Sequence, residues 1–239
     1  MELNTSVFYS GLEKLGISLS EEQINQFLKY YEMLVEKNKV MNLTAITEFE
    51  EVVVKHFLDS ISIGKYYDME NADTLIDVGT GAGFPGIPLK IAYPNLKITL
   101  LDSLNKRIKF LAEVCEELGL EDVELIHGRA EDFGINTTYR EKYNICVSRA
   151  VANLSTLSEY CLPFVKTGGY FISYKSGNID EELKNSQNAL RILGAELGKV
   201  ENFMLPDTDI GRSFVFIKKI KNMAKKYPRK AGLPSKEPL

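Results

Sequence analysis

The residues best suited to chemistry form a glycine-rich segment, D-V-G-T-G-A-G-F-P-G, at positions 77–86. Its glycines permit a tight turn and let a ligand approach the backbone closely. Pro85 suits the first turn of a helix, where its missing N–H would be unpaired anyway. Because the segment begins within a short, mostly apolar run at 74–78, it joins a predicted strand to a predicted helix. Doubly wound sheets bind nucleotide-like ligands at this position.

Two ligands compete for the glycine-rich segment. Gly81, Gly83 and Gly86 satisfy the G-x-G-x-x-G spacing of dinucleotide sites. Gly79, Gly81 and Gly83 also form the G-x-G-x-G that resembles motif I of class I methyltransferases. Asp77 favours the second interpretation, because a carboxylate two residues before the first glycine can bind the methionine amino group of S-adenosylmethionine. Beside a pyrophosphate the same carboxylate would be badly placed.

Two further segments extend the predicted cofactor site along the sheet edge. Asp102 and Ser103 come at the end of the second predicted strand, directly after residue 101, where a carboxylate accepts hydrogen bonds from ribose hydroxyls of either ligand. Residues 128–132, G-R-A-E-D, follow the third predicted strand, and we expect Ala130 and Glu131 to contact the adenine. The alternative is a polar helix start, in which the acidic side chains favour the helix dipole.

The residues that define the methyl acceptor in this fold usually follow the fourth strand, where the sequence here is S-R-A-V at 148–151. The Asn/Asp-Pro-Pro-Tyr/Phe pattern of adenine or cytosine amino methyltransferases is absent there. Cytosine C5 enzymes need a nucleophilic cysteine, and C-L-P at 161–163 does not match their pattern. Cys146 lies inside an apolar run and is predicted to be a core residue.

Without a motif for a base or a nucleophile, the chemistry is expected to rest on positioning. Guanine N7 fits, because it carries an in-plane lone pair and no proton to remove, so alignment with the methyl group suffices. Arg149 is the positioning candidate. It can neutralise a substrate phosphate, contact the guanine or brace the cofactor pocket, and the alternative is a surface arginine.

The elements that must hold these residues alternate along the chain. Residues 1–70 read as helices, with Ser20 as an N-cap and a second helix over 48–67 that carries His56 on one face. Helices are also predicted over 105–118 and 180–193. The predicted strands are 74–78, 97–101, 123–126, 143–147, 169–174, 195–203 and 213–220.

This alternation predicts an α/β fold, a Rossmann-like class I methyltransferase. The sheet is expected to have seven mostly parallel strands with a C-terminal antiparallel pair, and an N-terminal helical extension. Three parts follow: a helical extension at 1–70, a cofactor-binding domain at 71–221, and a basic tail at 222–239 that reads as irregular.

Composition narrows the class of protein. The chain has 239 residues, 44% hydrophobic and 26% charged, as in ordinary globular proteins. No apolar run is long enough to span a bilayer and no signal peptide is evident, so the expected location is the cytoplasm. Three cysteines without a Cys-x-x-Cys spacing and two distant histidines favour neither disulfides nor a metal site.

The charge is unevenly distributed. The net charge is −4, yet residues 218–239 hold eight basic residues against Glu237 alone. An acidic body with a basic end is the asymmetry expected of a protein that grips a polyanion at one place. The alternative is a solvated tail that keeps the chain soluble.

Six motifs together resemble the RsmG (GidB) family of bacterial enzymes. They are N-L-T at 42–44, K-H-F-L-D-S at 55–60, the glycine-rich segment continued to 89, G-R-A-E at 128–131, S-R-A-V at 148–151 and Y-P-R-K-A-G-L-P at 227–234. The resemblance implies methyl transfer from S-adenosylmethionine to N7 of a guanine in 16S ribosomal RNA. The implied partner is that RNA or the small ribosomal subunit. Cofactor contacts are implied at Gly79, Phe84, Ala130, Glu131 and Arg149.

The resemblance also gives the basic tail a role. The residues then expected to hold RNA phosphates are Lys225, Lys226, Arg229, Lys230 and Lys175. Tyr227 either stacks on a base or packs the tail onto the domain. Two competing functions stay open: a methyltransferase for a small molecule or protein, and a dinucleotide-dependent oxidoreductase or binding module.

Overall fold

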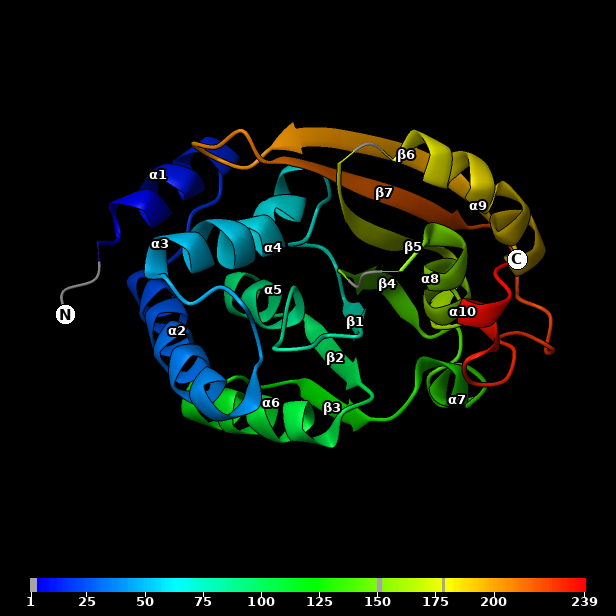
Figure 1. The fold of residues 1–239 in the computed structure, drawn as a ribbon, viewed down its shortest axis with the longest axis horizontal. Coiled ribbons are helices and arrows are strands. Elements are labelled where there is room, and N and C mark those ends of the chain that lie inside the picture. Colours follow the sequence, from blue (N-terminus) through cyan, green and yellow to red (C-terminus); the bar gives the residue numbers. More distant parts are fainter. Residues whose placement is uncertain (1–3, 150–151, 178) are drawn as a thin grey trace.

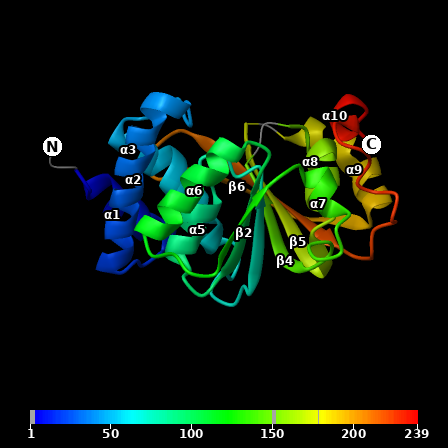
Figure 2. The same ribbon diagram turned by 90° about the horizontal axis from the view of Figure 1, so that it is seen from below.

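The protein is a three-layer α/β structure with a seven-stranded sheet between two layers of helices (Figure 1; Figure 2). The computed structural model describes residues 4–149, 152–177 and 179–239. The strands, in spatial order, are β3 (Val123–His127), β2 (Lys97–Asp102), β1 (Thr74–Val78), β4 (Tyr143–Ser148), β5 (Val165–Ser176), β7 (Gly211–Lys219) and β6 (Ala195–Met204).

The first five strands along the chain pair in parallel, and β7 pairs antiparallel with both β5 and β6. The predicted fold class is confirmed, including the antiparallel pair near the C-terminus. Parallel strands buried on both faces explain the continuous apolar runs of the sequence. Their carboxyl ends meet at one edge, which is where the glycine-rich segment, Asp102 and Arg149 lie.

Figure 2 shows the sheet edge-on with helices on both sides. One face carries the early helices α1 (Ser6–Leu15), α2 (Glu21–Met41), α5 (Gly86–Ala92) and α6 (Asn105–Glu117). The other face carries α7 (Ala130–Gly134), α8 (Leu154–Cys161), α9 (Asp180–Leu193) and α10 (Leu233–Lys236). A separate cluster of buried apolar side chains fills each face. No helix in the described part of the chain is long and apolar enough to cross a membrane.

Helix α2, from the N-terminal region, packs against the glycine-rich segment. Ser20 is its N-cap, as predicted, and forms a reciprocal capping box with Gln23. The fully buried Tyr30 donates a hydrogen bond of 2.5 Å to the carbonyl of Ala82. The N-terminal helices therefore share a core with the sheet, and Tyr30 of α2 holds the backbone of the glycine-rich segment.

The single helix predicted over 48–67 is wrong in detail. The chain forms α3 (Phe49–Val52), a π-helical turn over Val53–Leu58, α4 (Asp59–Ile61) and a 3-10 turn over Ser62–Lys65. Val52, Val53 and Val54 are all buried, and three successive positions cannot share one narrow face of an α-helix. A wider turn accommodates them, and such turns often occur at functional sites.

Two other elements depart from the prediction. Helix α8 has no counterpart in the expected elements, and the tail expected to be irregular contains α10 and packs on α8. Cys146 is fully buried, as expected of a core residue. Ala150 and Val151 of the S-R-A-V motif lie outside the described residues.

Candidate functional site

A cavity of about 320 Å³ opens beside the carboxyl ends of β1, β2 and β4. We call it the glycine-loop cavity. Its lining includes five residues that the sequence predicts as cofactor contacts: Gly79, Asp102, Ser103, Ala130 and Glu131. Residues at the ends of β1 and β2 and after β3 thus converge on one hollow, as expected at the switch point of a doubly wound sheet.

Asp102 fixes the backbone of the glycine-rich segment. Its Oδ2 accepts hydrogen bonds from the Gly81 N–H at 2.9 Å and from Arg107 Nη1 at 3.2 Å. Its Oδ1 accepts from the Leu104 N–H at 2.9 Å. Asp102 is 3% exposed, so water competes little for these hydrogen bonds. They hold the glycine-rich segment in place beside the cavity.

The glycines of the segment serve different purposes. Gly79, Gly81 and Gly83 have φ angles of 76°, 64° and 106°, a region that favours glycine. A Cβ on Gly81 would meet only the carbonyl oxygen of Gly79, at 4.0 Å. A Cβ on Gly83 would lie 2.7 Å from the Tyr30 hydroxyl. Gly83, predicted as a cofactor contact, therefore faces the packed N-terminal helices.

Asp77 lies fully buried beneath the segment, outside the lining of the cavity. Its Oδ2 accepts a hydrogen bond from the Gly86 N–H at 2.9 Å. Its Oδ1 and the nearby Thr80 Oγ1 make no hydrogen bond of ordinary geometry among the described residues, although the Thr80 hydroxyl lies near enough to oppose part of the rise in the pKa of Asp77. Burial raises the pKa of Asp77 to about 7. An orphaned buried oxygen that becomes anionic near neutrality fits a cationic group of a ligand.

Glu131 also lines the glycine-loop cavity. Its side chain begins in the first turn of α7 and is 6% exposed. Its Oε1 accepts a hydrogen bond of 2.7 Å from the backbone N–H of Gly232. A residue more than a hundred positions later in the chain thus touches a predicted cofactor contact.

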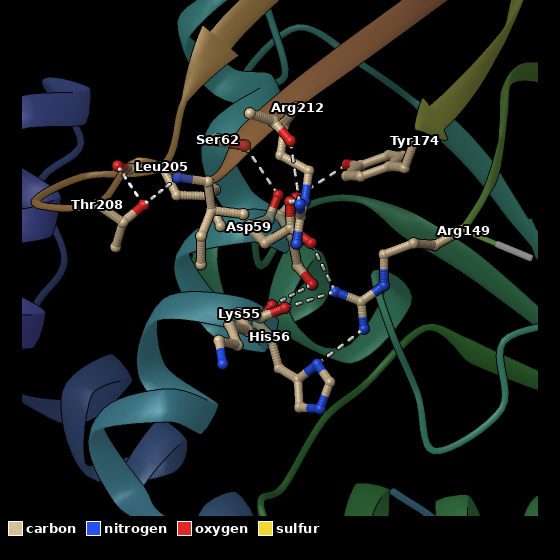
Figure 3. Close-up of polar contacts among 12 residues, drawn as sticks. Lys55, His56, Asp59, Ser62, Arg149, Tyr174, Leu205, Thr208 and Arg212 are labelled. Carbon is tan, nitrogen blue, oxygen red and sulfur yellow. Dashed lines mark hydrogen bonds and ion pairs between the residues drawn. The ribbon is translucent and has the colours of Figure 1, made fainter. Parts of the chain in front are cut away.

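A second cavity, of about 570 Å³, adjoins the first. We call it the arginine cavity. His56, Asp59, Arg149 and Arg212 contribute to its lining, and Figure 3 shows their side chains turned toward one another. Ala152 lines both cavities, which therefore meet after β4.

Two arginines share one buried carboxylate in the arginine cavity. Arg149 Nη1 donates to Asp59 Oδ2 at 3.0 Å and to the Lys55 carbonyl at 3.1 Å. Arg212 Nε donates to Asp59 Oδ1 at 3.2 Å. Asp59 is 2% exposed. The lining holds four cations (Lys55, Arg149, Lys175 and Arg212) against two carboxylates (Asp59 and Glu182), so an anionic ligand is favoured.

His56 lies at the centre of this arrangement, which corrects its interpretation as a helix-face residue. Its ring stacks on Phe84 with centroids 4.5 Å apart, and Arg149 lies 5.1 Å from the Phe84 centroid. Arg149 Nη2 donates to His56 Nδ1 at 3.1 Å, so the neutral ring carries its proton on Nε2, 3.0 Å from Thr44 Oγ1. Burial and the Arg149 charge lower the pKa of His56 to about 3.

The residues predicted to hold RNA phosphates divide into two groups. Lys225, Lys226 and Lys230 are exposed. Arg229 instead forms an ion pair with the buried Glu159, at 2.6 Å between Nη2 and Oε2. Lys175 is paired with Glu182 at 2.6 Å and is also bonded to a backbone carbonyl.

The position of Tyr227 decides between its two predicted roles, stacking on a base and packing the tail onto the domain. The side chain is 8% exposed and belongs to the cluster of buried apolar residues that includes Leu157. It therefore packs the tail onto the domain.

Residues 23–211 match the family described as rRNA small subunit methyltransferase G (GidB). This span is more than half of the chain. The chain belongs to the GidB family. The ribosomal RNA small subunit methyltransferase G of Lachnoclostridium phytofermentans is 55% identical over 99% of this chain and 98% of its own length. The protein of that name from Alkaliphilus metalliredigens is 54% identical over 98% of both chains.

Solved structures with low sequence identity share the fold. A SAM-dependent O-methyltransferase from Thermotoga maritima has a TM-score of 0.52 and 17% identity, covering 80% of this chain and 72% of its own. The fibrillarin pre-rRNA processing protein of Methanococcus jannaschii has a TM-score of 0.53 and 17% identity, covering 69% and 74%. At such identity the likeness shows the fold alone.

Within the GidB motifs, sequence reasoning assigned no site role to three polar residues of the arginine cavity network. Thr44, His56 and Asp59 belong to the N-L-T and K-H-F-L-D-S motifs, whose polar residues were a usable signal. Arg212 carried no signal, because it lies in an ordinary strand and reaches Asp59 only through the pairing of β7 with β5.

Proposed function

We propose that the protein transfers a methyl group from S-adenosylmethionine to N7 of a guanine in 16S ribosomal RNA, in the cytoplasm. The observation that carries the proposal is the meeting of two cavities after β4, in a chain of the GidB family. One is bordered by the glycine-rich segment and the other by cations. The substrate is the naked RNA or the small ribosomal subunit.

The glycine-loop cavity suits S-adenosylmethionine. Gly79 presents backbone without a side chain to the cavity, and Asp102 and Glu131 also line it, where their carboxylates suit ribose and adenine groups. The orphaned oxygen of Asp77 suits the ammonium of the methionine half. When bound, the cofactor supplies a methyl group on a sulfonium, whose sulfur takes the bonding electrons as guanine N7 attacks.

The arginine cavity suits the nucleotide that brings guanine N7 to the methyl group. Arg149 and Arg212 are held by Asp59, and Phe84 packs against Arg149 and His56. These contacts fix the cations before the substrate arrives, so binding orders few side chains. The cations lie where phosphates of the RNA would enter.

No proton acceptor is needed at N7, and the lining of the arginine cavity fits that chemistry. His56 is the only imidazole among its described residues, its pKa is about 3, and its Nδ1 already accepts from Arg149. It therefore acts as a packing and positioning residue. The chain's contribution is to orient the base and keep the site shaped.

The exposed Lys225, Lys226 and Lys230 form a basic edge at the C-terminal end of the chain. We assign to it the contact with RNA phosphates outside the cavities. Arg149 contacts the substrate from within the arginine cavity and is a positioning residue for the reaction.

The test is methyl transfer from labelled cofactor to 16S ribosomal RNA and to small ribosomal subunits, with the product mapped at nucleotide resolution. The expected result is a single N7-methylguanine that is absent from RNA of cells lacking the protein. Label on another base, or on protein, would contradict the proposal. Asp102→Ala, which removes the brace of the glycine-rich segment, should abolish the label.

A further inference from the structure

The C-terminal segment, residues 222–239, lies against α7 and α8 (Figure 1). Those two helices supply one side of the glycine-loop cavity, through Glu131 of α7 and through Leu157 and Tyr160 of α8. The segment therefore borders the same helices that shape the cavity, although its sequence suggests a basic tail.

Arg229 anchors the segment to α8 through a carboxylate that water barely reaches. Its backbone N–H and its Nε donate to Glu159 Oε1 at 2.7 and 2.9 Å, and its Nη2 donates to Oε2 at 2.6 Å. Glu159 is 1% exposed and precedes Tyr160 directly. A buried carboxylate bound at both oxygens by one guanidinium is left uncompensated when the arginine is removed.

Gly232 carries the same segment to α7. Its φ of 82° is a conformation that favours glycine, and its N–H donates to Glu131 Oε1 at 2.7 Å. The next turn adds a third anchor, because Thr156 Oγ1 of α8 donates to the Pro234 carbonyl at 3.0 Å. Helix α7 has five residues, so little of its own structure holds Glu131 in place.

We propose that the C-terminal segment shapes the adenosine end of the glycine-loop cavity, with Arg229 and Gly232 as positioning residues for Glu131 and α8. The inference rests on the proposed function, which assigns S-adenosylmethionine to this cavity. Lys225, Lys226 and Lys230 of the same segment point to solvent, so one stretch of chain presents cations outward and anchors inward.

The experiment measures the binding of two ligands to the full-length protein by calorimetry. S-adenosylhomocysteine carries both halves of the cofactor, and 5′-methylthioadenosine carries the adenosine half without the amino acid. Arg229→Ala should weaken both ligands by the same factor, about threefold to thirtyfold. Asp77→Asn should weaken S-adenosylhomocysteine alone, because Asp77 faces the amino-acid half.

Lys230→Ala is the matched control, since it removes the same charge from an exposed neighbour. It should leave both affinities unchanged and lower the slope of RNA affinity against salt by about one. Arg229→Ala should leave that slope unchanged. Arg229→Lys keeps the charge and should recover part of the ligand affinity, and it replaces Arg229→Ala if the alanine variant does not fold by circular dichroism.

Wild-type affinities for both ligands in folded Arg229→Ala would overturn the inference, as would a reduced salt slope without a loss of ligand affinity. A loss confined to S-adenosylhomocysteine would also contradict it, because the segment would then act on the wrong half. A wild-type protein that binds neither ligand contradicts the proposed function instead, so the two failures are distinct.

Discussion

The carboxyl group of Asp77 is buried beneath the glycine-rich segment, with one oxygen unpaired among the described residues. Desolvation raises the pKa of this group to about 7, so near neutrality the carboxyl is close to half ionised. Only the ionised form attracts the ammonium of the cofactor. We therefore expect this residue, at the centre of the predicted cofactor motif, to link cofactor binding to pH.

We expect the affinity for S-adenosylhomocysteine to rise with pH up to about pH 7 and then to level. Below that pH the proton on Asp77 must be displaced, so affinity falls by up to about tenfold per pH unit. Asp77→Asn should bind weakly at every pH and lose the dependence. The measurement is calorimetry between about pH 5.5 and 7.5, below the titration of the ligand's own amino group.

The control for Asp77 is Asp132→Asn, which removes an exposed carboxyl from α7. It should retain the wild-type dependence on pH. A wild-type affinity that stays constant over the range would show that Asp77 does not meet the ammonium.

The glycines allow a second prediction at the same scale. Gly81 and Gly83 both have positive φ, so either substitution by alanine strains the backbone by about 1–3 kcal/mol. Gly83→Ala also forces a methyl group to within 2.7 Å of the Tyr30 hydroxyl, whereas Gly81→Ala meets open space. The free energy of unfolding of Gly83→Ala, measured by urea denaturation, should therefore be lower than that of Gly81→Ala by about 1–3 kcal/mol. Equal losses would contradict this account of the packing.

Helices and strands could be predicted from the sequence where a regular pattern of apolar and polar residues runs through the whole element. The strands of the parallel sheet appear in the sequence as apolar runs, because both faces of each strand are covered. Helix α8 escaped prediction because Leu154, Thr156, Ser158 and Glu159 are all buried, so polar residues lie inward and no polar face marks the helix. The π turn escaped because it depends on three successive valines meeting a core that the sequence alone does not display.

The π-helical turn and α4 carry the K-H-F-L-D-S motif to the sheet edge, where Asp59 meets Arg149 from the chain after β4 and Arg212 from β7. Three elements thus depend on one buried carboxylate. Asp59→Asn leaves both guanidinium groups without their counter-charge, and we expect a loss of about 3 kcal/mol in the free energy of unfolding. Methyl transfer should fall with it, because Arg149 is no longer held.

Urea denaturation of Asp59→Asn and of Glu121→Gln checks this expectation. Glu121 is exposed, and its substitution should stay within about 0.5 kcal/mol of the wild type. Similar values for the two variants would mean that the ion pairs add nothing to stability and that the arginines are held by other contacts.

At the scale of the whole molecule, net charge conceals where the cations lie. The count of basic residues at 218–239 identified the basic end but not its orientation. Arg229 pairs with Glu159, and Lys219 is fully buried against Glu141 at 3.2 Å. A partner 70 residues distant is invisible to a local charge count, so the count includes cations that pair with carboxylates of the protein itself.

The exposed Lys225, Lys226 and Lys230 form the basic edge proposed to bind RNA, and their removal tests the division of the segment into outer and inner faces. Each phosphate contact releases counterions, so RNA affinity should fall steeply with salt in the wild type. The triple alanine variant should flatten the slope of log affinity against log salt by up to about three, with cofactor affinity unchanged. Lys65, Lys97 and Lys109 are exposed elsewhere, and replacing them removes equal charge without touching this edge. Binding measured at several salt concentrations compares the three proteins. If the two triple variants have the same slope, the basic edge makes no phosphate contacts of its own, and the proposed role of these three lysines is wrong.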